Sequence, residues 1–286
     1  MEHQKYLLKL HSELLSIMLK VDQVCEENKL KYYLVGGSLL GAIRHNGFIP
    51  WDDDLDIAMP RDDFDRFISI ADQQLSPNYE LQWITTNNEY WQVFAKVVKK
   101  GTLFKEPSLK KFSSLGIFID IFPLDLAPQY SSKLEKKKRQ IRRINSIIWA
   151  KNSARYDFKH LPSLILSKFI STTRLQKVMC FIMQSTKKSG ATHYVNFGSQ
   201  YRLAKQTMPI EWYGDGVRHQ FEGYSFIIPT ESVKVLSSIY GANYMDLPPE
   251  NKRRCHYPEK ILFSDGEVMT FDKPAHIVTV REQENY

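Results

Sequence analysis

The stretch that decides the fold is VGGSLLGAIRHNGFIPWDDDLDI, residues 35–57. It opens at the end of a short aromatic and β-branched run, residues 31–35, which predicts a strand. Ser38 is a residue type that caps helix N-termini, and residues 39–45 then predict a helix that stops at Gly47. A strand, a glycine turn and a helix in succession indicate α/β structure.

Two acids follow in residues 49–59, which predict an extended segment. Asp54 and Asp56 are separated by one residue, and side chains along a strand alternate between its two faces. We therefore expect both carboxylates on one face and Leu55 and Ile57 on the other. The competing interpretation is an acidic surface turn. A calcium-binding loop fits less well, because the glycine and the closing glutamate of that pattern are missing.

A third acid, Asp120, stands alone in the apolar run IFIDIF, residues 117–122, which predicts a buried strand. Burying an unpaired carboxylate costs several kcal/mol unless a cation meets it. A helix cap or a core salt bridge is the alternative. If this strand lies beside Asp54 and Asp56, three carboxylates converge, and their oxygens suit Mg²⁺ or Mn²⁺. Two such ions about 4 Å apart would bridge the phosphates of a substrate.

The residues Gly36, Gly37 and Ser38 form a candidate phosphate loop. Glycines let the backbone approach a phosphate, and a helix N-terminus offers free N–H donors. A plain turn is the competing interpretation. The order of strand, loop, helix, Asp-x-Asp strand and lone Asp resembles the nucleotidyltransferase superfamily. In that superfamily the loop holds the phosphates of the donor and the three acids hold metals.

A closer resemblance extends over several motifs. Residues 35–57 are similar to the LicD family of phosphorylcholine-type transferases, with the fukutin-related proteins as distant relatives. The segments Phe94-Ala95-Lys96, Ile119-Asp120-Ile121-Phe122-Pro123-Leu124-Asp125, Tyr240-Gly241 and Tyr244-Met245-Asp246-Leu247-Pro248-Pro249 agree with that family. The resemblance implies transfer of a phosphoryl-alcohol, usually phosphocholine from CDP-choline, to a sugar hydroxyl. The acceptor would be a cell-surface glycan such as teichoic acid, capsule or lipopolysaccharide, or its lipid-linked precursor.

The resemblance also implies roles for single residues. Asp54, Asp56 and Asp120 are the expected metal ligands and catalytic residues, with Asp120 as a possible general base for the acceptor hydroxyl. His45 and His256 are alternative bases. The donor-binding residues would be Gly36, Gly37, Ser38, Arg44 and Lys96, of which the last two offer positive charge to phosphate oxygens.

Composition sets the outer limits. With 43% hydrophobic and 25% charged residues, the chain is a folded protein rather than a disordered one. Three scattered cysteines argue against a disulfide framework or a cysteine-based zinc site. The N-terminus lacks the apolar core of a signal peptide, so we expect a cytoplasmic protein, peripheral at most on the inner face of the membrane. A net charge of +7 favours acidic partners.

The predicted architecture is α/β (α+β), with a nucleotidyltransferase-like core in which helices flank a mixed sheet. We expect this catalytic core at residues 1–128, a helical, basic substrate or membrane-facing region at 129–215, and a C-terminal segment at 216–286 that packs back on the core. Pro60 is expected in the first turn of a helix. Further strands are predicted at 79–84, 92–98, 117–122 and 220–228, and further helices at 7–25, 132–152, up to 185 and at 232–240.

Three other functions compete with this prediction. A nucleotidyltransferase would move a nucleoside monophosphate onto a small molecule. A basic protein with an inactive fold would bind nucleic acid, which we disfavour because all three acids are present. A non-catalytic membrane adaptor would use the basic helix at 132–152, whose more ordinary role is a solvated amphipathic face.

Overall fold

The computed structural model describes residues 2–75, 77–86, 90, 92–105, 116–152, 170–186, 190–253, 255 and 257–271. Its helices are α1 (Glu2–Glu27), α2 (Gly36–His45), α3 (Arg61–Leu75), α4 (Ser132–Asn152), α6 (Thr172–Gln184), α7 (Ile210–Tyr213) and α8 (Ser232–Tyr240), with 3-10 turns η2 (Leu203–Gln206) and η3 (Glu250–Lys252). Its strands are β1 (Tyr33–Leu34), β2 (Asp56–Pro60), β3 (Tyr79–Gln82), β4 (Ala95–Lys99), β5 (Leu103–Lys105), β6 (Phe118–Ala127), β7 (His193–Val195), β8 (Thr207–Pro209), β9 (Val217–Phe221), β10 (Tyr224–Ile228), β11 (Lys260–Leu262) and β12 (Val268–Thr270).

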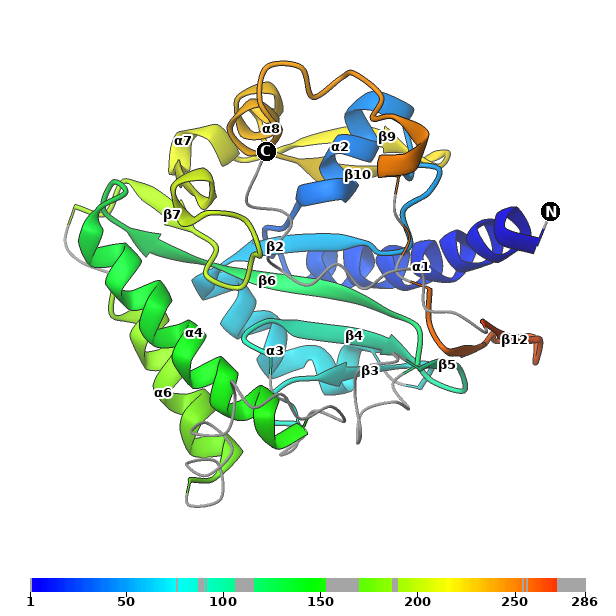
Figure 1. Cartoon of the computed structure of the whole chain (residues 1–286), viewed down its shortest axis with the longest axis horizontal. Helices are drawn as coiled ribbons and strands as arrows, with labels where there is room; N and C mark the ends of the chain where they lie inside the picture. The colour runs from blue at the N-terminus through cyan, green and yellow to red at the C-terminus, as the bar shows by residue number, and fades with distance from the viewer. Residues whose placement is uncertain are drawn as a thin grey trace.

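A mixed sheet forms the centre of the molecule (Figure 1). Its strands follow the order β1-β2-β6-β4-β3, with β7 paired to β6 and β8 to β7. The pair β2–β6 is parallel, whereas β1–β2, β4–β6 and β3–β4 are antiparallel. Helices α1 and α3 pack along the sheet. The predicted α/β class, with a mixed sheet flanked by helices, is therefore confirmed.

The main core lies between the sheet and α1. Apolar residues recur along α1 at helical spacing, and Leu10, Leu14 and Ile17 are almost fully buried. On the strands, Ile57 and Ile121 are fully buried as well. Each such side chain contributes about 1.5–3 kcal/mol when removed from water. This packing fixes which face of β2 and β6 is apolar, and so leaves the opposite face for polar side chains.

The segment around β2 departs in two details from the sequence prediction. The strand begins only at Asp56, so the extended segment predicted for residues 49–59 is regular over its last part alone. Pro60 ends β2, and α3 begins at Arg61. Pro60 was expected inside the helix because proline is tolerated in a first turn, but its fixed φ fits the end of an extended strand equally well.

The C-terminal part of the described chain adds two small sheets. The single strand predicted at 220–228 is instead the hairpin β9–β10, turning at Glu222 and Gly223, which both have positive φ. Such two-residue turns match the twist of paired strands, which explains why one continuous strand was the wrong prediction. Strand β11 pairs with β12 and with β5, so residues far apart in the sequence form one sheet.

Helices α4 and α6 lie side by side at one end of the molecule (Figure 1). Helix α4 occupies the range predicted for the basic helix, and its apolar face is buried through Leu134, Ile141 and Ile148. Strands β7 and β8 follow α6 and extend the central sheet, which sequence reasoning had not predicted. None of the helices in the described part of the chain combines the length and apolarity needed to cross a bilayer.

Candidate active site

Three side chains, Asp56, Asp120 and Lys96, form a row across the centre of the sheet, which we call the acid row. Asp56 on β2 and Asp120 on β6 are register partners on parallel strands. Asp120 is also the register partner of Lys96 on β4. Adjacent strands lie about 4.8 Å apart, and register partners project to the same face. The three side chains therefore stand next to one another on the face opposite Ile57 and Ile121.

Lys96 and Asp120 form an ion pair within this row. The Lys96 ammonium donates to Asp120 Oδ1 over 2.6 Å, and the two side chains are 4% and 17% exposed. The ammonium also lies 3.3 Å from the centre of the Phe118 ring. The cation that the half-buried Asp120 requires is thus supplied by the protein. This pair is the core salt bridge that was considered as an alternative for this acid. Whether Lys96 also contacts a phosphate stays a prediction.

Asp56 occupies an unfavourable position for a negative charge. Burial raises the pKa of its carboxyl well above the ordinary range, and the charges of Asp54, Asp120 and Asp52 raise it further, while Lys96 opposes them. Burial also raises the pKa of Asp120, but Lys96 opposes that rise by charge and by hydrogen bond. Asp56 therefore lacks the compensation that Asp120 has, and a proton or an additional cation would stabilise it.

The acidic run before β2 divides into separate environments. Asp54 is half-buried and Leu55 is fully buried, so the predicted alternation holds although Asp54 precedes the strand. Asp53 is buried, and its Oδ2 accepts a hydrogen bond from Cys255 Sγ at 3.2 Å. Asp52 lies against the glycine loop, since a Cβ on Gly37 would come within 2.5 Å of Asp52 Oδ2. Sequence reasoning gave neither residue a role.

The glycine loop lies beside Asp56. Gly36 has φ +56, which glycine adopts without strain, and a Cβ at this position would lie 3.6 Å from Asp56 Oδ2. The predicted helix cap was wrong: α2 begins at Gly36, and Ser38 Oγ instead accepts a hydrogen bond from the Asp56 N–H at 2.8 Å. The helix starts at the left-handed Gly36, three residues earlier than predicted, so Ser38 lies within its first turn and is buried. The first helical N–H groups thus begin next to the acid row.

Arg44, at the other end of α2, contacts the chain rather than the acid row. Its Nη1 donates to the carbonyls of Tyr244 and Asp246, both at 3.1 Å. Its neighbour His45 packs edge-on against Trp51, and burial together with the Arg44 charge lowers the pKa of His45. The phosphate contact expected of Arg44 stays a prediction.

His256, the other histidine considered as a base, lies outside the described residues.

The fit of this row to a divalent cation rests on its chemistry. Asp54 and Asp120 are carboxylates close enough to Asp56 to act on it by charge, and they offer only oxygen donors, as Mg²⁺ and Mn²⁺ prefer. Burial first, and then these carboxylates, raise the pKa of Asp56. In the described part of the chain, however, no three His, Cys, Asp or Glu side chains are grouped as a metal site. Asp120 is turned to Lys96 instead. The metal ligands therefore stay a prediction.

Two tyrosines near the acid row had no predicted role. Tyr201 lies between β7 and η2, in a region that shows no motif, and Tyr240 ends α8. Burial raises the pKa of both phenols, and the charges of Asp52 and Asp56 raise both further. The Tyr240-Gly241 motif was the available sequence signal for Tyr240. For Tyr201 the sequence offers none.

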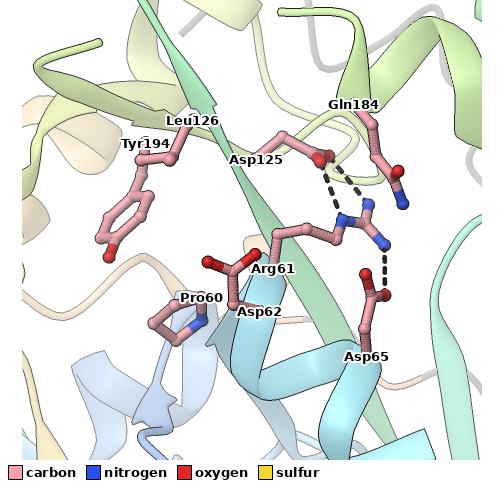
Figure 2. Close-up of a pocket in the computed structure, with 8 residues that line it drawn as sticks. All are labelled: Pro60, Arg61, Asp62, Asp65, Asp125, Leu126, Gln184 and Tyr194. Carbon is pink, nitrogen blue, oxygen red and sulfur yellow. Dashed lines mark hydrogen bonds and ion pairs between the residues drawn. The ribbon is translucent and has the colours of Figure 1, made fainter. Parts of the chain in front are cut away.

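A pocket opens at the far end of β2 and β6 from the acid row (Figure 2). It is lined by Pro60, Arg61, Asp62, Asp65, Asp125, Leu126, Gln184 and Tyr194. The Arg61 guanidinium donates to both carboxylate oxygens of Asp125, at 2.8 and 2.9 Å, and both side chains are buried. Because Asp125 lies five positions after Asp120, it projects from the opposite face of β6. Asp125 thus pairs with α3 and not with the acid row.

Known proteins resemble the chain over the part that carries these residues. Residues 29–146 match the family described as LicD/FKTN/FKRP, nucleotidyltransferase domain. The chain carries a LicD family domain. It holds β1, α2, β2, β4 and β6, and hence the acid row, the glycine loop and Lys96.

Relatives extend the similarity beyond the LicD domain. The chain is 29% identical over 249 residues to the lipopolysaccharide cholinephosphotransferase LicD of Haemophilus influenzae, covering 82% of this chain and 89% of that protein. It is also 38% identical over 76 residues to an uncharacterized protein of Rickettsia prowazekii, covering 27% of each chain. The first match reaches past the LicD domain, so it includes part of the helical or C-terminal regions that surround it.

Proposed function

We propose that this protein is a metal-dependent phosphotransferase that moves phosphocholine from CDP-choline to a sugar hydroxyl of a cell-surface glycan. The observation that carries the proposal is the row Asp56, Asp120 and Lys96 beside the start of α2, inside a LicD domain. The name of the Haemophilus influenzae relative supports phosphocholine as the group transferred and lipopolysaccharide as one class of acceptor.

The reaction is a displacement at the phosphorus nearest choline. The acceptor hydroxyl oxygen forms a new bond to that phosphorus, and the bond from this phosphorus to the oxygen bridging to CMP breaks. CMP leaves with the electron pair, and the hydroxyl proton passes to Asp120. Lys96 supports this role because its charge opposes the rise in the pKa of Asp120, which keeps the carboxylate able to accept a proton.

The acids and the glycine loop bind and orient the donor. Asp54, Asp56 and Asp120 would hold Mg²⁺ or Mn²⁺, which when bound offsets charge on the diphosphate and on the departing CMP. The backbone N–H groups at Gly36 and Gly37, at the start of α2, point to diphosphate binding, because helix N-termini attract anions. The Ser38 hydroxyl accepts from the Asp56 N–H and so fixes the loop against the acid.

A donor screen tests this proposal. The purified protein is incubated with Mg²⁺, a glycan acceptor and CDP-choline, CDP-glycerol or CDP-ribitol, and CMP release is measured together with the mass of the product. We expect CMP release and a product heavier by phosphocholine. A product heavier by a nucleoside monophosphate would instead support a nucleotidyltransferase. Wild-type turnover by Asp56→Asn would contradict the assignment of the acid row.

A contact with anionic membrane is part of the proposal for a lipid-linked acceptor. Helix α4 exposes Lys136, Arg139 and Arg143, and α6 exposes Phe181 (74%) and Val178 (47%). Exposed basic and exposed apolar side chains on two helices in contact favour the surface of an anionic bilayer. Flotation with vesicles containing anionic lipid should carry the protein upward, and Phe181→Ser should weaken this. Equal flotation with neutral vesicles would argue against charge-driven docking.

A further inference from the structure

The phenols of Tyr201 and Tyr240 meet at the edge of the acid row. The Tyr201 hydroxyl donates to the Tyr240 hydroxyl over 3.2 Å. Their ring centres are 5.7 Å apart, and the planes cross at 83°. Two rings at this angle form a corner, which presents an electron-rich face beside a ring edge.

The corner lies near several carboxylates and near the cation Arg44, which interacts by charge with Tyr240. The charges of Asp52 and Asp56 act on both phenols, and that of Asp54 acts on Tyr201 as well. Both side chains are half-buried rather than fully enclosed. A cation at this corner would therefore meet ring faces and carboxylates together, and would lose only part of its water.

The loop that carries Tyr201 is held by its own set of bonds. Lys138 of α4 is buried and donates to the carbonyls of Ser199 and Tyr201, at 3.0 and 2.9 Å. The Asn196 side chain accepts from the N–H groups of residues 198 and 199. Helix α4, which lies outside the acid row, thus holds the backbone that carries the Tyr201 ring.

The same loop is fastened to the helix that carries the second ring. Lys205 of η2 donates to the carbonyl of Ile239 at 2.8 Å, one residue before Tyr240. The two rings are therefore fixed relative to each other by backbone contacts as well as by their hydroxyls. Such preorganisation is what a binding corner requires, because little side-chain freedom remains to be lost on binding.

Other aromatic rings around the acid row already have a cation of the protein over them. The Arg253 guanidinium lies 4.6 Å from the Trp51 ring centre, and the Lys96 ammonium 3.3 Å from that of Phe118. Within the part of the chain that the structure describes, no protein cation lies over the rings of Tyr201 or Tyr240. The rings of Tyr201 and Tyr240 thus carry no cation from the described residues and can receive one brought by the substrate.

We propose that Tyr201 and Tyr240 bind the quaternary ammonium of the choline unit and so select choline over neutral alcohols. This inference rests on the proposed function. A trimethylammonium group is large, weakly hydrated and positively charged, so it is attracted to the faces of aromatic rings. Glycerol and ribitol carry no charge and lack this attraction. Lys138 acts as a positioning residue, because it holds the backbone of Tyr201 and touches no substrate.

The test compares ring and hydroxyl at each position. Phosphocholine binding is measured by calorimetry for wild type, Tyr240→Phe, Tyr240→Leu, Tyr201→Phe and Tyr201→Leu, with CMP as the matched control ligand. We expect each leucine variant to bind phosphocholine roughly tenfold more weakly, each phenylalanine variant to stay within about twofold of wild type, and CMP binding to be unchanged. Equal losses in the phenylalanine and leucine variants would overturn the proposal, because the hydroxyls would then be responsible. An unchanged affinity in all variants would overturn it too.

A second measurement does not depend on the variants folding. Wild-type protein should bind phosphocholine more tightly than phosphoethanolamine and glycerol phosphate, and equal affinities would contradict the inference. The two proposals fail differently. If CMP is released from CDP-choline equally well by wild type and the leucine variants, the corner is wrong and the transfer stands. If no CDP-alcohol releases CMP while phosphocholine binding still depends on the two rings, the transfer is wrong and the corner stands.

Discussion

The ammonium of Lys96 lies 2.6 Å from the Asp120 carboxylate, so a cation of the protein already compensates the acid that was predicted to require a metal. Asp56, the register partner of Asp120 on the other side, feels the charge of Lys96 but has no hydrogen bond from it, and burial raises the pKa of Asp56 well above its ordinary range. A divalent ion would therefore be needed more by Asp56 than by Asp120. The two acids can therefore be tested separately, Asp56 by stabilisation with metal and Asp120 by removal of Lys96.

Mg²⁺ or Mn²⁺ should stabilise the protein through Asp56. At a concentration 100 times its dissociation constant, a ligand that binds only the folded state adds about 2.7 kcal/mol to the free energy of unfolding. We expect thermal unfolding to shift upward with either metal in wild type and to stay in place in Asp56→Asn. Without metal, Asp56→Asn should be at least as stable as wild type at pH 7, because it removes a buried charge that its neighbours repel. An equal metal shift in both proteins would argue against a site at Asp56.

Lys96→Met should separate the structural and catalytic roles of this lysine. Removing one partner of a mostly buried ion pair costs on the order of 3 kcal/mol, because Asp120 is left without its cation. The same change removes a competitor for the carboxylate, so the stabilisation by Mg²⁺ should grow while turnover falls. Urea unfolding with and without Mg²⁺ measures both effects. Lys96→Arg is the control that keeps the charge, and a metal effect that shrinks in Lys96→Met would contradict the prediction.

The buried Lys138 should give the protein a characteristic pH dependence. Burial lowers the pKa of this lysine from its ordinary 10.5 to about 8. Between these two values the folded state binds fewer protons than the unfolded state, so the free energy of unfolding rises with pH across this window. Lys138→Met lacks the titration, so its stability relative to wild type should fall from pH 8 to pH 10.5. The upper limit of this change is about 3 kcal/mol, and urea unfolding at several pH values measures it.

Lys138→Met should also weaken binding of the donor CDP-choline. If Lys138 positions Tyr201, this variant raises the KM for CDP-choline more than it lowers kcat, because binding of the choline unit is disturbed and the acid row is not. A change in kcat alone would indicate a different role. Its backbone contacts at Ser199 and Tyr201 are the reason to expect the first outcome.

Arg61→Met should lower the free energy of unfolding without changing donor binding by the folded protein. Asp125 is 1% exposed, and the Arg61 guanidinium donates a hydrogen bond to each of its two carboxylate oxygens (Figure 2). Losing the guanidinium leaves a buried carboxylate uncompensated, at a cost of about 3–5 kcal/mol. Arg61→Lys should recover only part of this, since lysine cannot form the paired contact. Residual folded protein should keep the wild-type KM for the donor, and a raised KM would contradict a purely structural pair.

The sequence predicted those features that depend on local pattern. The alternation of Asp54, Leu55, Asp56 and Ile57 follows from strand geometry, and it survives although the regular strand begins only at Asp56. Helices α4 and α8 occupy their predicted ranges because apolar spacing marks a helix face directly. Two mistakes arose at boundaries, where Gly36 starts a helix earlier than Ser38 would and Pro60 ends a strand, and a third missed the turn inside 220–228.

Features that depend on distant contacts escaped sequence reasoning. The pairing of Lys96 with Asp120 depends on the register of β4 against β6, which no local pattern specifies. Tyr201 meets Tyr240 only because its loop is bonded to Lys138 and the following η2 turn to α8. The short strands β7 and β8 have too few residues to show a period. Each of these is set by tertiary packing.

Strand β6 places two acidic residues, Asp120 and Asp125, on opposite sides of one ribbon, each with its own basic partner. A screen that records only lost activity would score substitutions at both positions alike. If the proposed role of Asp120 holds, its substitution would lower turnover per folded molecule, whereas substitution of Asp125 would lower the amount of folded enzyme. Soluble yield, measured alongside turnover, distinguishes a folded enzyme with lower activity from a loss of folded enzyme.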